Sequence, residues 1–172
     1  SGNSSIHVGN ATSSGNPDSA TGFYNTYYYS DSFTMEDNAS IIINATNGRS
    51  YGIDDATNVT LRDNASITST TSNSSGTAYG ITGAGTSLTI EANSNVQITV
   101  SGLSSIGIDS SKVTMYSGTI SASSYADYPH WGALGVGIQN GSLTLIDGTV
   151  NVNNTGGVGY AYGITGGSMY TG

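Results

Sequence analysis

The stretch SLTLIDGTVNV, residues 142–152, holds two short runs in which apolar and polar residues alternate, with a turn between them. Leu143 and Leu145 are the apolar members of the first run, and Val150 and Val152 are those of the second. An alternation of period two is typical of a β-strand that buries one face, and the Asp-Gly pair between the runs is typical of a tight turn. The stretch therefore predicts two short strands, neither of which can bury its apolar face alone.

The same pattern returns along the chain. Triplets that align with the LTL of residues 143–145 begin 25 to 30 residues apart, and a second alternating run follows each triplet except the last. The other triplets are FTM (33–35), VTL (59–61), LTI (88–90), VTM (113–115) and MYT (169–171). A third motif is an aromatic or branched residue, then glycine, then isoleucine: YGI (51–53), YGI (79–81), IGI (106–108), VGI (136–138) and YGI (162–164). Each repeat thus contains three short strands.

Repeats of this kind bury their apolar faces by stacking, so that each strand pairs with the same strand of the next repeat at about 4.8 Å. We therefore expect an all-β protein: a right-handed parallel β-helix, or β-solenoid, of about six coils of 25 to 30 residues with three strands each. The right-handed sense is the general rule for parallel crossover connections. Residues 1–172 are expected to form a single domain.

The alternation also predicts which side chains face the core. The outer residues of each triplet should point inward and the middle threonine outward, which gives an external ladder of Thr60, Thr89, Thr114 and Thr144. In the first strand we expect Ile53 and its equivalents inside, with Tyr51 and Tyr79 on the same side. The glycines between them, Gly52 among them, should then face the other way. Such a column indicates either a bend that closes the coil or a stripe without side chains for a partner. The alternative for the tyrosines is a local reversal of the strand, in which they form an exposed aromatic ladder, because buried tyrosine hydroxyls need partners.

Composition limits the function classes. Three basic residues stand against eleven acidic ones, with a net charge of -8, which argues against nucleic acid or an anionic membrane as a partner. No apolar run approaches the roughly 18 residues of a membrane-spanning helix, so we expect no membrane insertion. The chain has no cysteine, so disulfides and thiolate metal sites are ruled out.

Catalytic and metal sites are not indicated by the sequence. Asp37, Asp63 and Asp147 share a turn position, but other repeats carry Ala92 and Ser117 there, so the carboxylates form no obvious dyad and could bind calcium only weakly. The two histidines, one at position 7 and one at position 130, have no nucleophile motif to match them. We expect no enzyme activity, no cofactor and no metal.

Two corner insertions, at residues 9–26 and 123–134, lengthen the connection before a first strand. Loops on solenoids often carry the function, and aromatic side chains on a loop suit sugar stacking or a partner's hot spot. The alternative is that the aromatic rings fold back over the rod. The candidate ligand or partner contacts are Tyr125, Tyr128, His130, Trp131, Phe23 and Tyr24.

Asparagine occurs often in the Asn-X-Ser/Thr pattern that accepts N-linked glycans. The positions are Asn3, Asn10, Asn38, Asn44, Asn58, Asn64, Asn73, Asn140 and Asn153, and all are expected to face solvent. The alternative is that polar turns are simply rich in asparagine and serine.

The two ends of the chain are expected to be open. The sequence starts in a third strand at residues 5–8 and ends in a second strand at residues 168–172, without a polar or helical cap. Unpaired strand edges invite association, so either this is an excerpt of a longer rod or subunits stack head to tail. The residues of these assembly edges are Ile6, His7, Val8, Met169, Tyr170 and Thr171.

Repeats of the form SLTLIDGTVNV (142–152) and VTMYSGTISA (113–122), joined by strands that contain Gly-Ile, resemble bacterial and archaeal cell-surface β-helix repeat proteins. Examples are autotransporter passenger domains and filamentous-haemagglutinin-type adhesins. The resemblance implies an extracellular or cell-surface protein with a structural or adhesive role, which associates with itself, end to end or laterally, or binds host or matrix glycans. The alternative function is a carbohydrate-binding or carbohydrate-active module that uses the corner loops.

Overall fold

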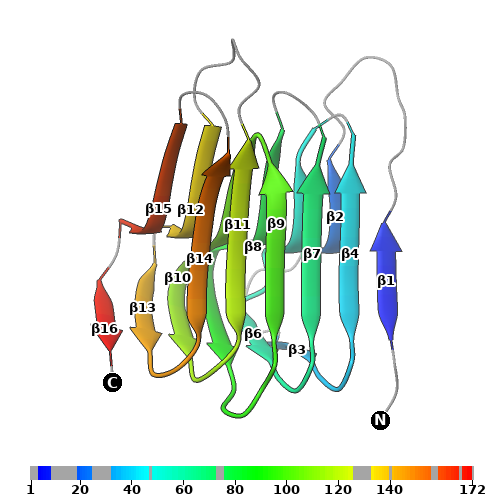
Figure 1. Ribbon diagram of the computed structural model, residues 1–172. Helices are drawn as coiled ribbons and strands as arrows, with labels where there is room; N and C mark the ends of the chain where they lie inside the picture. The colour runs from blue at the N-terminus through cyan, green and yellow to red at the C-terminus, as the bar shows by residue number, and fades with distance from the viewer. Residues whose placement is uncertain are drawn as a thin grey trace.

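The computed structural model describes residues 4–8, 19–24, 32–46, 48–72, 76–125, 133–139, 141–155, 159–166 and 168–171 (Figure 1). Within these ranges the chain forms strands joined by turns and bends, and every strand pairing is parallel. The fold is an all-β parallel β-solenoid with three strands per coil and about four turns of roughly 28 residues. The described residues include no apolar helix of membrane-spanning length.

The strands form three walls, which we number by their order in the repeat. The third wall is a six-stranded sheet seen from the front in Figure 1. Its strands, in spatial order, are β1 (Ser5–Val8), β4 (Ser40–Ala45), β7 (Ser66–Thr71), β9 (Gln97–Gly102), β11 (Thr119–Tyr125) and β14 (Thr149–Thr155). Because the spatial order follows the chain order, each coil lies directly on the one before it.

The first and second walls are joined at a corner, since two long strands run through both. The first wall contains β2 (Ala20–Tyr24), β5 (Ser50–Asp54), the beginnings of β8 (Thr77–Ile90) and β10 (Ser104–Met115), β12 (Ala133–Gln139) and β15 (Gly159–Thr165). The second wall contains β3 (Ser32–Met35), β6 (Asn58–Leu61), the ends of β8 and β10, β13 (Ser142–Leu145) and β16 (Met169–Thr171).

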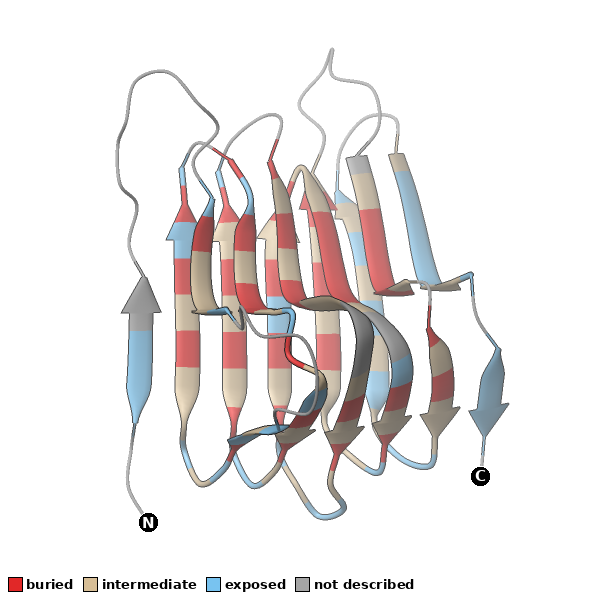
Figure 2. Ribbon diagram, turned by 180° about the vertical axis from the view of Figure 1, so that it is seen from behind, coloured by how far each residue is buried: buried red, intermediate tan, exposed pale blue. Residues whose placement is uncertain are grey.

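The core lies between the three walls, and the predicted register of the second and third walls is confirmed. Leu88, Val113 and Leu143 occupy one inward column and are each 0 % exposed, and Ile98 and Ile120 are equally buried in the third wall. The threonine ladder is also confirmed, because Thr60, Thr89, Thr114 and Thr144 are cross-strand partners and only partly buried. Figure 2 shows the alternation as buried bands across successive strands.

Of the two predicted orientations of the first-wall tyrosines, the structure shows the outward one. Ser50 is fully buried and lies within hydrogen-bonding distance of the Ser69 hydroxyl across the core, with 2.8 Å between the two Oγ atoms. The next residue, Tyr51, therefore points outward, where its ring stacks on Tyr79 with centroids 5.1 Å apart and planes 7° from parallel. The tyrosines form a half-buried external pair instead of part of the core.

The glycine column faces the core, which differs from the prediction. A Cβ atom on Gly52 would overlap the Ile67 side chain of the third wall and lie 2.5 Å from the carbonyl oxygen of Gly80. The following residue, Ile53, is nevertheless fully buried. Both can face inward because the strands bend at this point, as the ends of β12 and β15 show in Figure 1. The glycines thus mark the bend that closes the coil, and no stripe without side chains faces outward here.

Both predicted insertions have different boundaries in the structure. The insertion expected at residues 9–26 contains strand β2, which pairs with β5 and places Gly22 in the column of Gly52. In the insertion expected at residues 123–134, β11 continues to Tyr125 and β12 begins at Ala133. The residues between these two strands lie outside the described part of the chain.

Candidate functional site

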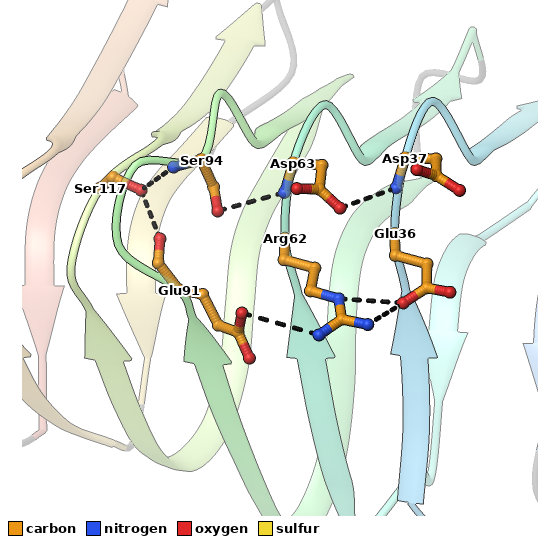
Figure 3. A network of polar contacts seen from close by, with 7 residues as sticks. All are labelled: Glu36, Asp37, Arg62, Asp63, Glu91, Ser94 and Ser117. Carbon is orange, nitrogen blue, oxygen red and sulfur yellow. Dashed lines mark hydrogen bonds and ion pairs between the residues drawn. The ribbon is translucent and has the colours of Figure 1, made fainter. Parts of the chain in front are cut away.

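Polar groups form a ladder along the corner between the second and third walls (Figure 3). The backbone amide of Asp37 donates to Asp63 Oδ2, that of Asp63 to Ser94 Oγ, and that of Ser94 to Ser117 Oγ, each over 3.1 Å. The Ser117 hydroxyl donates to the carbonyl oxygen of Glu91 over 2.5 Å. Each turn therefore satisfies a backbone amide of the turn in the preceding coil.

The turns of this ladder need residues that tolerate a left-handed backbone. Asp37, Asp63 and Asn93 have φ values of 56°, 58° and 60°. Aspartate and asparagine adopt this conformation more readily than other residues with a side chain, and glycine adopts it freely. Gly118 and Gly148, with φ values of 87° and 116°, stand in the corresponding turns of later coils. The residue types of the turns are thus explained by backbone geometry alone.

Charges next to the ladder are also paired along the stack. The Arg62 guanidinium donates to Glu36 Oε2 from Nε over 2.9 Å and also from Nη2, and its Nη1 lies 4.0 Å from Glu91 Oε2. All three side chains are nearly half exposed to solvent, so the pairs contribute little to stability. Nowhere in the described ranges do three or more His, Cys, Asp or Glu side chains gather as metal ligands would. In the described ranges, the corner consists of hydrogen bonds and ion pairs that join neighbouring coils.

The aromatic candidates from the insertions have different surroundings. Tyr125 ends β11, and its hydroxyl donates to the carbonyl oxygen of Thr71 in β7 over 3.0 Å, across the end of β9. Phe23 packs against the core, with its ring centroid 4.2 Å from that of Phe33. Tyr24 is 56 % exposed, whereas Tyr128, His130 and Trp131, predicted ligand contacts, lie outside the described residues.

The predicted glycosylation positions are exposed wherever the structure describes them. These are Asn38, Asn44, Asn58, Asn64 and Asn153. Three of them are engaged in hydrogen bonds along the stack: Asn64 Nδ2 donates to Asn38 Oδ1 over 3.1 Å, and the Thr70 hydroxyl donates to Asn44 Oδ1 over 2.6 Å. The remaining positions, Asn3, Asn10, Asn73 and Asn140, lie outside the described residues.

Asp54 is the carboxyl group with the most perturbed protonation among the described residues. It lies in β5 between Tyr24 of β2 and Thr82 of β8. Partial burial, with a smaller contribution from the charge of Asp55, raises the pKa of Asp54 to about 6. A raised folded-state pKa means that the charged carboxylate is less favourable in the folded chain than in the unfolded one.

Large apolar side chains are exposed at both ends of the coil stack (Figure 2). At the N-terminal end Ile6 is 42 % exposed, and at the C-terminal end Met169 and Tyr170 are 55 % and 63 % exposed. Tyr160 and Tyr162, also exposed, stack on each other in β15 with centroids 5.9 Å apart. These residues belong to strands that pair on one side only within the described part of the chain.

The predicted assembly edges coincide with these strands. In β1 the backbones of Ile6, His7 and Val8 pair with Ile41, Ile42 and Ile43 of β4, and the opposite edge of β1 has no described neighbour. In β16 the predicted edge residues Met169, Tyr170 and Thr171 pair with Leu143, Thr144 and Leu145 of β13. The two ends are therefore the surfaces of the described molecule that combine free strand edges with exposed apolar side chains.

Comparisons of the chain with protein-family models, with curated proteins and with solved structures gave no match.

Proposed function

We propose that this protein is a structural β-solenoid that associates end to end with further copies of itself. Support for the proposal comes from one observation: both ends of the coil stack expose apolar residues beside free strand edges, and the two ends continue the same columns. A surface of this kind favours pairing with another strand edge. Head-to-tail contacts between identical chains do not close on themselves, so they build a fibre.

The columns of the two ends match residue by residue. Successive strand pairings connect Ile6 with Val150 along the third wall. They connect Phe23 with Ile164 along the first wall. Along the second wall they connect Phe33 with Met169. Stacking of two copies in this register would place apolar side chains on apolar side chains in all three walls.

The proposed setting is extracellular, at a cell surface, and the proposed role is structural or adhesive without enzyme activity. The polar, weakly charged surface and the lack of cysteine support this setting, as does the resemblance of the repeats to surface β-helices. A right-handed rod of about six coils would be roughly 30 Å long. End-to-end growth would turn such short rods into long fibres.

Electron microscopy and sedimentation velocity of the purified chain over a range of concentrations test the proposal. We expect fibres from the wild-type chain and none from Ile6→Asp, because burying an unpaired carboxylate in the junction costs several kcal/mol. Ile42→Asp is the matched control, since Ile42 lies one strand further in, between the buried Ile41 and Ile43, and is itself only partly buried. It should form fibres like the wild type. A wild-type chain that stays monomeric at every concentration would contradict the proposal.

A further inference from the structure

The glycine column of the first wall is closely packed at all of its members except the last. A Cβ atom on Gly107 would lie 2.6 Å from the carbonyl oxygen of Gly137, and one on Gly137 would lie 2.6 Å from that of Gly163. Both distances are shorter than real Cβ atoms tolerate. At Gly163 the same added atom would meet nothing within 4 Å. The open space at Gly163 is therefore a site that the described chain leaves empty.

Two groups fill this space at each of the other glycines. One is the carbonyl oxygen of the glycine in the next strand of the first wall, and the other is a β-branched side chain of the third wall. The side chains are Ile41 for Gly22, Ile67 for Gly52, Ile98 for Gly80, Ile120 for Gly107 and Val150 for Gly137. At Gly163 both groups are missing.

The N-terminal end of the chain carries both missing groups in the correct columns. Gly22 begins the glycine column, because Thr21 and Phe23 on either side of it pair with Tyr51 and Ile53 of β5. Ile6 pairs with Ile41 and thus begins the column of β-branched side chains. Its side chain is 42 % exposed in the single chain, so it is available to a neighbour.

We propose that the N-terminal end of a second copy of this chain occupies the open space at Gly163. The Gly22 carbonyl of that copy lies against Gly163, and its Ile6 side chain packs beside it. In this register β15 pairs with β2, β14 with β1 and β16 with β3 of the second copy. The inference rests on the proposed end-to-end association, and it adds the register of the junction and the residue that determines it.

The absence of a side chain at residue 163 then serves the junction and not the fold of the single chain. Among the described residues, an alanine methyl group at this position would meet no atom within 4 Å beyond its own chain neighbours, whereas in the junction it would overlap the Gly22 carbonyl and Ile6 of the second copy. Overpacking of a closely fitted core is strongly unfavourable because the neighbouring backbone cannot move aside.

The test is Gly163→Ala, examined by thermal unfolding and by sedimentation velocity across concentrations. We expect an unchanged unfolding midpoint at concentrations where the chain is monomeric, and an increase of about tenfold or more in the concentration needed for half-assembly. Gly137→Ala is the matched control: its methyl group clashes inside the chain, so the unfolding midpoint of the monomer should fall. A second variant, Ile6→Ala, removes the other half of the contact and should weaken assembly by a similar factor.

The outcomes separate the register from the association itself. If the wild-type chain assembles and both Gly163→Ala and Ile6→Ala assemble equally well, the register is wrong while end-to-end association stands. If the wild-type chain does not assemble at all, both the proposed function and the proposed junction are wrong. A loss of stability of the Gly163→Ala monomer would also overturn the inference, because the space at Gly163 would then be needed by the single chain.

Discussion

Gly52 and Tyr51 show how one glycine changes which side chains of an alternating strand face the core. In a straight strand Tyr51 and Ile53 would share a face, with Gly52 on the other. In the structure Gly52 faces the core, Ile53 is buried as well, and Tyr51 points outward to stack on Tyr79. The strand bends at the glycine, where a Cβ atom would strike the opposite wall. A period-two alternation cannot anticipate this, because it holds only while the strand stays straight.

The single residue Asp54 predicts how the stability of the fold depends on pH. Its folded-state pKa of about 6 lies above the roughly 3.9 of an unfolded chain, so the folded state holds the proton more tightly. Folding therefore becomes less favourable as pH rises from about 4 to above 6, and the full cost applies above the folded pKa. Asp54→Asn removes this cost. The free energy of unfolding should therefore rise by about 1 kcal/mol or less, a small gain because the side chain is partly solvated.

Denaturant unfolding of the wild-type chain and Asp54→Asn at pH 4 and pH 7 measures the effect. The variant should be more stable than the wild type at pH 7 and nearly equal to it at pH 4. An equal stability difference at both pH values would contradict the assignment of the cost to Asp54.

At the scale of elements, the second and third walls could be predicted from the sequence because their strands are short and alternate regularly. Leu143 and its column mates are buried as the pattern indicates. Strand β2 was not predicted, since its sequence ATGFY has threonine before the glycine and phenylalanine after it, where the other repeats have tyrosine, isoleucine or valine before it and isoleucine after it.

The polar ladder was only partly predictable, because turns of different length bring different sequence positions into it. Counting from the triplet at residues 88–90 places Ala92 beside the aspartates, whereas Ser94 is the residue in the ladder. The turn that contains Ser94 is longer than its equivalents, because β9 begins at Gln97. Side-chain acceptors in a turn can be recognised in the sequence, but their alignment depends on the lengths of the turns on either side.

Asp63 offers a test of how much the ladder stabilises the corner. Asp63→Ala removes the acceptor for the Asp37 amide and puts alanine at a φ of 58°, so we expect a loss of about 1 to 3 kcal/mol in unfolding free energy. Asp63→Asn keeps a side-chain oxygen and tolerates the same backbone, so its loss should be clearly smaller. Chemical denaturation compares the two, and equal losses would mean that the ladder does not stabilise the turn.

At the scale of the whole molecule, the three walls meet at a core that runs the length of the described stack, and the end strands of this stack expose apolar side chains. Each interior coil receives its strand partners, its packed glycine and its turn ladder from the coils on either side. Among the described residues, the last coil has no such contacts on its outer side, since a Cβ atom on Gly163 would meet nothing within 4 Å. In a stack of identical units, the contacts missing at one end are those that the other end presents.

The central claim is that the two ends are complementary to each other, and mixing two variants tests it most directly. Gly163→Ala impairs the C-terminal end and leaves the N-terminal end intact, whereas Ile6→Asp does the reverse. Each variant alone should remain monomeric in sedimentation velocity at a concentration where the wild type forms fibres. Mixed in equal amounts, they should form a one-to-one complex that grows no further, because only one pair of ends is intact. A mixture that stays monomeric, or a single variant that forms fibres alone, would contradict the account.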